Sequence, residues 1–340
     1  METFSVRGPS EGLFLACQSI RSVGKRKQSR NGPVLEFPAP VLIRYRKPVE
    51  RVLFYPQRDA NPFFHLMEGL WMLAGRRDVE FVDHYNSRIH EYSDDGKIFH
   101  GAYGYRWRHW FNVDQLDVAV QRLKDYPNDR RTVVAMWDAH EDLKPTNDFK
   151  DVPCNTSIYF KLCDDTNTLD MTISNRSNDL IWGTFGANAV HMSMLLEYMA
   201  ARVGAKVGSY YQFTNNLHAY ESVLDKLGRH EKGTFNPDYD PYLHLGEDNL
   251  SYNPPPLVDY PEVFDQELKE WFEDPNKYTF ANSYLFRTCT QVREAWKQYK
   301  EDNLVGAITF AEGIHDRAWQ KACIEWLERR VEKRRSSQGR

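Results

Sequence analysis

Residues 152–179 read VPCNTSIYFKLCDDTNTLDMTISNRSND, and this stretch predicts the centre of the fold. Thr156–Leu162 and Thr168–Ser174 are rich in β-branched, aromatic and apolar residues, which is typical of strands. The residues between them, 163–167, predict a hairpin turn. Cys154 comes just before the first strand, where a side chain can point into a cleft at the end of a sheet.

Predicted helices and strands surround this hairpin along the chain. Residues 13–27 predict a short helix that ends in a basic loop, LFLACQSIRSVGKRK. The spacing of apolar residues predicts further helices over Asn61–Leu73, Asp114–Tyr126 and 188–203, and a helical pattern from about residue 263 to the end. Further strand-like stretches are Thr132–Trp137 and Val34–Tyr45, the second of which is interrupted by Pro38 and Pro40. The sequence therefore predicts an α+β fold.

The domain organisation follows from a change in composition. Residues 229–262 are rich in Pro, Tyr, Asp and Asn, which is typical of a long loop or a linker. We expect a catalytic domain over residues 1–262 and a helical C-terminal extension over residues 263–340.

Composition excludes several classes of protein. The 340 residues are 41% hydrophobic and 27% charged, which is typical of a globular protein and not of a disordered chain. No apolar run approaches the roughly 18 residues of a membrane span, and the N-terminus lacks a signal peptide, so we expect a cytoplasmic protein. The formal charge of −4 gives no electrostatic footprint for nucleic acid. Five scattered cysteines predict neither disulfides nor a metal site.

Four arginines in loop-like contexts change the interpretation of Cys154. A lone cysteine near a strand is more often a buried packing residue, and a single arginine is more often solvated. Here, however, Arg30, Arg130, Arg131 and Arg176 each lie beside small polar residues, and Ser177 follows the last of them. Guanidinium groups and a hydroxyl suit a phosphate dianion, and nearby positive charge lowers the pKa of a thiol.

These residues and others occur in an order that resembles the thymidylate synthase superfamily, which includes nucleotide hydroxymethylases. The resemblance runs from about Arg30 to Tyr220. Its motifs are the Arg-Asn-Gly turn at 30–32, Glu68 in HLMEGLWMLAG, AYGYRWRHW at 102–110, Arg130-Arg131, Pro153-Cys154, Arg176-Ser177-Asn178-Asp179 with Gly183, Asn188, and NNLHAY with His218 and Tyr220. It implies a mixed β-sheet packed with helices.

The resemblance also implies a bisubstrate enzyme that acts on a pyrimidine nucleoside monophosphate with 5,10-methylenetetrahydrofolate as cosubstrate. Cys154 would add to C6 of the base, and C5 would then take up a one-carbon unit. Near the reaction centre, the resemblance implies proton relay by Glu68, a position beside the thiol for Tyr103 and folate contact by Asp179. For the nucleotide, it implies base contact by Asn188, sugar contact by His218 and Tyr220, and phosphate binding by Arg30, Arg176 and Ser177. It also implies that Arg130 and Arg131 bind the phosphate in the other subunit of a homodimer.

Two departures from the family pattern bear on the product. Asn155 follows the nucleophile where thymidylate synthases usually carry His. His90 stands where the methylating enzymes place a Trp that packs over the reaction centre. A smaller, polar imidazole can admit or position water, which favours hydroxymethylation over methylation. The alternative is that His90 is only a loop histidine.

Two further departures concern the base and the C-terminus. Eleven residues after Arg176 the chain has Ala187, and a one-residue insertion makes Asn188 the base-pairing residue instead. Asn188 favours uracil, because an amide can pair with O4 and N3–H, whereas Ala187 in register leaves cytosine open. The chain also continues into a basic end instead of the short apolar tail of the methylating enzymes.

We therefore predict a folate-dependent hydroxymethyltransferase acting at C5 of dUMP, with dCMP or CMP as the next candidates. Such an enzyme would serve hypermodified DNA and could be encoded by a virus. A thymidylate synthase that makes dTMP from dUMP is the alternative within the family. An inactive nucleotide-binding or RNA-binding module is the alternative from another class, based on the basic, aromatic residues 100–110 and the Lys/Arg-rich tail.

Overall fold

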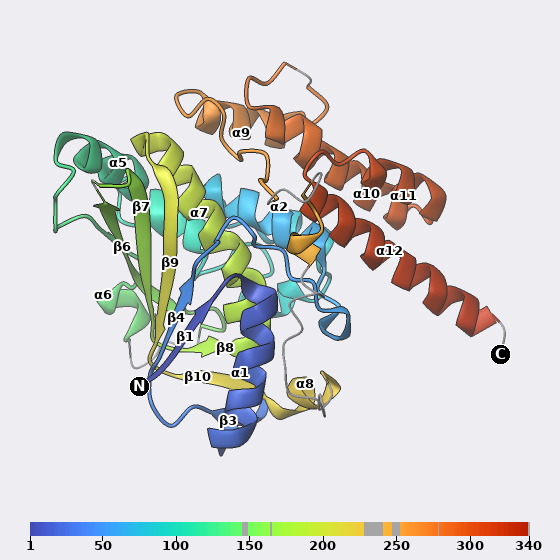
Figure 1. The fold of residues 1–340 in the computed structure, drawn as a ribbon, viewed down its shortest axis with the longest axis horizontal. Coiled ribbons are helices and arrows are strands. Elements are labelled where there is room, and N and C mark those ends of the chain that lie inside the picture. Colours follow the sequence, from blue (N-terminus) through green and yellow to red (C-terminus); the bar gives the residue numbers. More distant parts are fainter. Residues whose placement is uncertain (145–148, 164, 228–240, 247–251, 278, 339–340) are drawn as a thin grey trace.

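A mixed six-stranded sheet lies at the centre of the computed structural model (Figure 1), in the order β1-β4-β9-β7-β6-β5. The structure describes residues 1–340 apart from 145–148, 164, 228–240, 247–251, 278 and 339–340. The β1–β4 and β7–β9 pairs are parallel and the other pairs are antiparallel. The strands are β1 (Glu2–Val6), β4 (Val41–Tyr45), β5 (Val133–Ala135), β6 (Asn155–Cys163), β7 (Thr168–Asn175) and β9 (Lys206–Thr214). The predicted α+β fold with a mixed sheet is confirmed.

The predicted hairpin at 156–174 is formed by β6 and β7. Cys163 pairs with Thr168 at the turn. At the other end the Arg176 backbone N–H donates to the Cys154 carbonyl at 2.9 Å. The hairpin thus places the thiol and the Arg176 guanidinium at the same end of the sheet.

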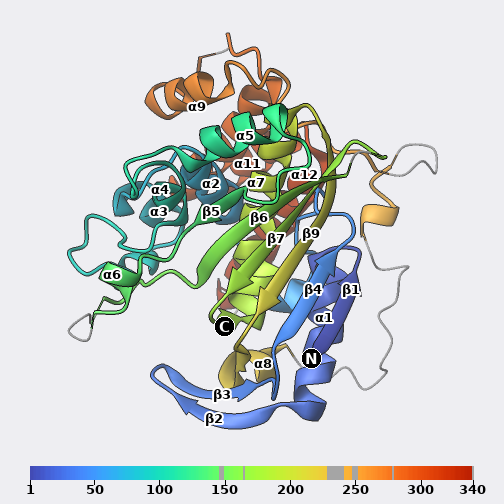
Figure 2. The ribbon, with the colours of Figure 1, turned by 90° about the vertical axis from the view of Figure 1, so that its left-hand side faces the viewer.

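A second sheet of four strands, in the order β2-β3-β10-β8, lies below the first sheet in Figure 2. Its strands are β2 (Lys25–Ser29), β3 (Gly32–Glu36), β8 (Asn178–Asp179) and β10 (Leu217–Tyr220). Residues 24–27 were expected to be a basic loop that ends a helix, and this expectation is wrong. The helix ends at Val23, and Lys25–Ser29 pairs with β3 through a turn in which Gly32 takes a positive φ of 116°.

Helices cover one face of the large sheet. The helix α7 (Asn188–Val203) packs on β7 and β9, and α2 (Pro62–Leu73) packs on α7. The predicted helices over 61–73 and 188–203 are confirmed, and Asn61 caps α2 by accepting from the Phe64 N–H. The other helices before residue 230 are α1 (Pro9–Val23), α3 (Val79–Tyr85), α4 (Tyr103–Arg108), α5 (Gln115–Asp125), α6 (Ala139–Asp142) and α8 (Glu221–Lys226).

The face of the sheet turned to the viewer in Figure 2 has no helix over it among the described residues. Val133 and Tyr159 are partners across the β5–β6 pair, and both side chains are exposed. Exposed apolar side chains on a sheet face are typical of a surface that another chain covers.

The aromatic, basic residues 100–110 are an internal structural element. Arg106 is fully buried and pairs with Asp142 at 3.0 Å, and Trp110 lies over its guanidinium. Arg108 is also buried and pairs with Asp114 and Asp265. These arginines are neutralised inside the protein, so this stretch does not form the RNA-binding surface considered above.

The C-terminal helices pack against α2 and share the hydrophobic core with it. Phe63 of α2 packs against both Trp296 and Trp326, with ring centroids at 5.3 and 5.5 Å. Part of the expected loop over 229–262 lies outside the described residues. The C-terminal helices are α9 (Phe264–Glu273), α10 (Gln291–Lys300), α11 (Leu304–Glu312) and α12 (Arg317–Gln338).

The basic residues near the C-terminus also have a structural partner. Arg329, Arg330 and Lys333 of α12 surround the carboxylate of Asp59. Burial opposes ionisation of Asp59, but the hydrogen bonds and charges of these residues lower its pKa to about 2. The tail therefore tethers α12 to the loop before α2, and it offers little support for an RNA-binding surface.

Candidate active site

Cys154 is half-buried at the end of the large sheet, beside two groups that can activate it. Arg176 donates to the backbone carbonyls of Val152 and Pro153 at 2.9 Å, and its Nη2 lies 3.8 Å from the Cys154 Sγ. Burial raises the pKa of the thiol, whereas the Arg176 charge and a hydrogen bond from Tyr103 act in the opposite direction. Three predicted site residues, Cys154, Arg176 and Tyr103, therefore lie together.

Two carboxyl groups, Glu68 and Asp151, interact near the thiol. Burial first, and the negative charge of Asp151 second, raise the pKa of Glu68 to about 8. Burial also raises the pKa of Asp151, although the Gly101 N–H donates to its Oδ2 at 2.8 Å. Asp151 is also close enough to Cys154 and Tyr103 to raise their pKa values. A carboxyl with a pKa near neutrality beside a nucleophile can exchange protons with a substrate.

Asp151 and His191 are site residues that the sequence analysis missed. Asp151 lies three positions before the nucleophile, and only its acidic character beside Pro153-Cys154 could have drawn attention to it. His191 lies one helical turn after Asn188, so the two share a face of α7. Its Nε2 lies 3.2 Å from the Glu68 Oε2.

Asp179 caps the helical segment Leu180–Ala187 with one carboxylate oxygen and leaves the other without a partner among the described residues. Its Oδ1 accepts from the backbone N–H groups of Ile181 and Trp182. Its Oδ2 is buried and has no hydrogen-bond partner among the described residues. Burial raises the pKa of Asp179. An unpaired buried carboxylate oxygen is costly, which indicates that a donor from a ligand completes the site.

Asn188, at the start of α7, is buried and linked to Asn178. The Asn188 Nδ2 donates to the Asn178 Oδ1 at 3.3 Å, and the Asn178 Nδ2 is buried without a partner among the described residues. Gly183 permits this arrangement, because a Cβ there would lie 2.1 Å from the Asn178 Oδ1. Asn188 thus lies beside Asn178, the sequence neighbour of Asp179.

An exposed aromatic surface lies next to Asp179. Trp182 is 51% exposed, and the Arg58 guanidinium lies 3.9 Å from the centre of its ring. Burial lowers the pKa of Arg58 to about 10, and Asp179 is the first of two negative charges that oppose this shift. A flat apolar ring held by a cation beside a carboxylate suits a planar heterocycle that carries N–H donors.

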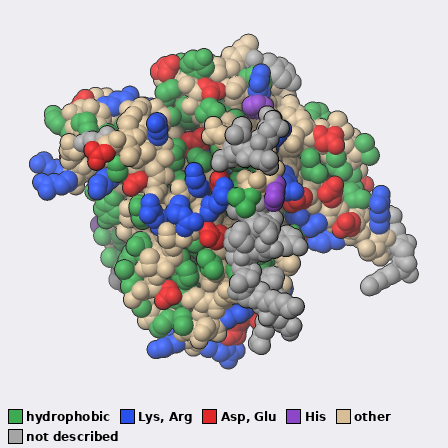
Figure 3. All heavy atoms as spheres, viewed as in Figure 1, with side chains coloured by type: hydrophobic (Ala, Val, Ile, Leu, Met, Phe, Trp, Pro, Cys, Tyr) green, Lys and Arg blue, Asp and Glu red, His purple; other side chains and the backbone are tan. Residues whose placement is uncertain are grey.

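The second sheet carries the residues predicted to bind the sugar and the phosphate, and it connects them to Asp179. His218 of β10 pairs with Asp179 of β8 in the parallel register, and Tyr220 pairs with Val34 of β3. Arg30 is exposed in the β2–β3 turn, and Ser177 is half-buried between Arg176 and β8. Figure 3 shows lysine and arginine side chains along the lower edge of the molecule, where β2 and β3 lie.

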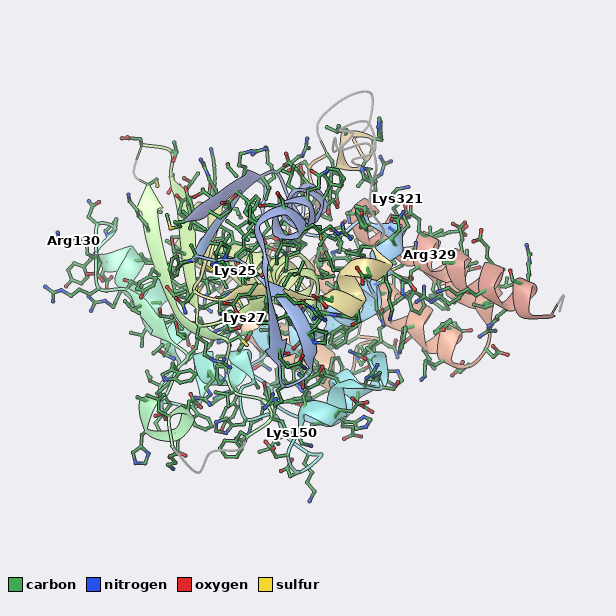
Figure 4. All side chains as sticks on the ribbon, turned by 90° about the horizontal axis from the view of Figure 1, so that it is seen from below. Lys25, Lys27, Arg130, Lys150, Lys321 and Arg329 are labelled. Carbon is green, nitrogen blue, oxygen red and sulfur yellow. The ribbon has the colours of Figure 1, made fainter. Side chains whose placement is uncertain are left out.

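Arg130 and Arg131 are not brought together with these groups within one chain. Both are exposed, in the connection between α5 and β5. Figure 4 places Arg130 at the far edge of the molecule, well away from Lys25 and Lys27 of β2. This position is compatible with the expected contact to a second chain.

His90 lies on a short helical turn, Ile89–Tyr92, at the surface. Its side chain is 54% exposed, and its Nδ1 lies 2.8 Å from Asp83. Asn155, by contrast, is buried, and its Nδ2 lies 3.9 Å from the Met192 sulfur. The effect of His90 on the product stays a prediction.

Among the described residues, no group of three or more His, Cys, Asp or Glu side chains could hold a metal ion. No helix in this part of the chain is both long and apolar enough to cross a membrane.

The sequence is similar to those of known enzymes. The model of the family described as thymidylate synthase matches residues 15–260. The deoxyuridylate hydroxymethyltransferase of Pseudomonas phage M6 is 42% identical, and the similarity covers 97% of this chain and 95% of the relative. The protein of the same name from Bacillus phage SP01 is 35% identical over 84% of this chain and 74% of the relative. A putative thymidylate synthase of Methanothermobacter thermautotrophicus is 33% identical over 49% of this chain and 73% of the relative.

Proposed function

The chain belongs to the thymidylate synthase family, and we propose from this premise that it is a deoxyuridylate hydroxymethyltransferase. It transfers a one-carbon unit from 5,10-methylenetetrahydrofolate to C5 of dUMP and leaves a hydroxymethyl group there. The observation that carries this proposal is that Arg176 and Tyr103 lie beside Cys154, while Asp151 acts on both Cys154 and Glu68. The similarity to two phage hydroxymethyltransferases supports the choice of base and product.

Cys154 starts the reaction as the nucleophile. Its thiolate forms a bond to C6 of the uracil, and the electrons of the C5–C6 double bond move toward O4. The Glu68 carboxyl supplies a proton for the developing oxyanion, either directly or through water. Because C5 then carries electron density, it can bond to the incoming one-carbon unit. Loss of the C5 proton to solvent and departure of tetrahydrofolate leave an exocyclic methylene on C5. Water adds to this methylene, and expulsion of the Cys154 thiolate from C6 restores the C5–C6 double bond. Arg176 and Tyr103 favour the thiolate that begins this sequence.

The nucleotide phosphate is assigned to Arg30, Arg176 and Ser177, and the sugar to His218 and Tyr220. Arg176 can serve both the phosphate and the thiol, because its guanidinium is exposed while two of its nitrogens are held by backbone carbonyls. The second sheet supports this assignment, since it joins the strands that carry His218, Tyr220 and Asp179.

The residues present fit a folate. When bound, methylenetetrahydrofolate supplies a one-carbon unit at the oxidation level of formaldehyde. The buried, unpartnered Oδ2 of Asp179 can accept from the N–H edge of the pterin, and Trp182 offers an adjacent flat surface. Arg58 holds the Trp182 ring in place.

Asn188 is assigned to the uracil base. It is buried at the start of α7 and interacts with Asn178, so its amide is held in one orientation. An amide can match both the O4 acceptor and the N3–H donor of uracil. No carboxylate stands at this position to match the amino group of cytosine.

The test is tritium release from 5-tritiated dUMP, dCMP and CMP in the presence of methylenetetrahydrofolate, followed together with absorbance at ~340 nm. We expect release from dUMP without the rise in absorbance that dihydrofolate gives, because hydroxymethylation leaves tetrahydrofolate. Mass spectrometry of the nucleotide should show 5-hydroxymethyl-dUMP. Tritium release accompanied by a rise in absorbance would identify a thymidylate synthase instead. No tritium release from any of the three nucleotides would favour a binding module.

We further assign Arg130 and Arg131 to the phosphate site of a partner chain in a homodimer. The helix-free sheet face with exposed Val133 and Tyr159 supports this assembly. Mixing inactive Cys154→Ala chains with Arg130→Gln/Arg131→Gln chains should restore activity, because one site of each mixed dimer is then intact. If subunits exchange at random in an equal mixture, half of the dimers are mixed and each has one intact site, so the rate should be about a quarter of that of the wild type. Activity no higher than that of the arginine variant alone, despite exchange shown by native mass spectrometry, would refute the assignment.

The biological setting follows from the relatives. We infer that the chain is encoded by a phage and acts in the cytoplasm of the infected host, where 5-hydroxymethyl-dUMP would supply hypermodified DNA. We also keep the division into a catalytic domain over 1–262 and a helical extension over 263–340 as part of this proposal. The family match ends at residue 260, which supports that boundary.

A further inference from the structure

A buried pair of histidines, His65 and His191, lies beside Glu68, with ring centroids 6.4 Å apart. His65, on α2, is 5% exposed, and His191, on α7, is 3% exposed. Burial lowers the pKa of His191 to about 3 and that of His65 well below its ordinary value. Both rings are therefore neutral at physiological pH, and a neutral imidazole has one donor nitrogen and one acceptor nitrogen.

The surroundings of the His191 ring favour one tautomer. The backbone of His65 acts to raise the pKa of the ring, as a carbonyl does when a ring N–H points toward it. The Nε2 is buried, has no hydrogen-bond partner among the described residues and lies 3.2 Å from the Glu68 Oε2. A proton on Nδ1, toward His65, leaves the lone pair on Nε2, the nitrogen beside Glu68. A carboxylate there would place two lone pairs against each other, whereas a carboxylic acid would donate a hydrogen bond.

Helix packing holds the two groups at this distance. Gly69, next to Glu68, lets α2 approach α7, because a Cβ at this position would lie 2.5 Å from the Met194 sulfur. The same Cβ would contact the His191 ring at 3.5 Å. The lack of a side chain at residue 69 thus sets the spacing between Glu68 and His191.

We propose that His191 is a positioning residue that holds Glu68 as the neutral carboxylic acid, through a hydrogen bond from the Glu68 carboxyl to His191 Nε2. The titratable groups that act on Glu68 are His191 on α7, at 3.2 Å, and Asp151 in the segment before β6. The negative charge of Asp151 acts in the same direction as His191. The enzyme thereby keeps ready the proton that the uracil oxygen requires, and this use of the proton rests on the proposed function.

The test measures the Glu68 proton in the free protein. The infrared band of the Glu68 carboxyl is identified as the one that disappears in Glu68→Gln. Its pH midpoint is then measured in the wild type, in His191→Phe and in His191→Gln, and the exposed His140→Gln is the control. His191→Phe removes the acceptor, so its midpoint should fall by roughly half to one pH unit. His191→Gln keeps an acceptor oxygen within reach and should lie closer to the wild type. An unchanged or raised midpoint in His191→Phe would overturn the proposal.

A second measurement needs no substitution. The ¹⁵N shifts of His191 in the intact chain should show a neutral ring with the proton on Nδ1 from pH 5 to 8. A proton on Nε2, or a charged ring, would contradict the proposal even if every variant failed to fold. Neither measurement involves a nucleotide or a folate, so failure here is distinct from failure of the proposed function, which the tritium assay tests.

Discussion

Replacing Cys154 with alanine is expected to reduce turnover by roughly 10⁴-fold or more, because no other group can form the bond to C6. Among the described residues, the other cysteines lie elsewhere. Cys17, Cys289 and Cys323 are buried, and Cys163 lies at the far end of β6. Tritium release from labelled dUMP measures the loss, and calorimetry should show that dUMP still binds, since the arginines remain.

Cys163→Ala is the matched control for this experiment. It changes a half-buried cysteine on the same strand, and its Sγ contact is with Asp170 at 4.0 Å, at the hairpin turn. We expect wild-type turnover from Cys163→Ala. If Cys154→Ala retained turnover, covalent catalysis by this thiol would be ruled out, and loss of dUMP binding in Cys154→Ala would show that the substitution damages the whole site.

The sequence predicted the elements whose apolar residues follow one simple period. The helix α7 starts at Asn188 and ends at Val203 as predicted, because its apolar face is regular and Gly204 ends it with a φ of 85°. The hairpin of β6 and β7 was found from its residue types in the same way. Local pattern was sufficient in both cases.

The central strand β9 escaped the analysis for a physical reason. Its buried face carries Tyr210, Gln212 and Thr214, which resemble surface residues in the sequence. The Gln212 Nε2 donates to Thr184 at 3.1 Å, a residue 28 positions away. Such burial is stable only because the partner comes from another element, and local sequence does not contain that information.

In the candidate site, too, some residues could be predicted from the sequence and others could not. The family pattern predicted Cys154, Glu68 and Arg176, and the structure places Arg176 beside Cys154, with Asp151 acting on both Glu68 and Cys154. Asp151 and His191 were missed, because their effect on Glu68 arises only when the segment before β6 and the helix α7 come to lie beside α2. The pKa of a carboxyl depends on burial and neighbouring charge, and both are properties of the folded chain.

Replacing Glu68 with glutamine is expected to lower kcat by about 10² to 10⁴-fold, the usual loss for a general acid. Glutamine keeps the shape of the side chain and can still hold water, but it has no acidic proton to give. The KM for dUMP should change much less, because phosphate and sugar contacts lie on other residues. Exposed Glu80 on α3 is the control, and Glu80→Gln should behave as the wild type.

The pH profile of kcat separates a proton donor from a residue that only fills space. Burial first, and Asp151 second, raise the pKa of Glu68 to about 8. The acid form therefore predominates at neutral pH, so the wild-type kcat should be constant below about pH 8 and fall above it. Glu68→Gln should lose this alkaline limb and show a flat, low profile. A limb that persists in Glu68→Gln would assign the titration to another group, and a wild-type kcat that rises through pH 8 would make Glu68 a base.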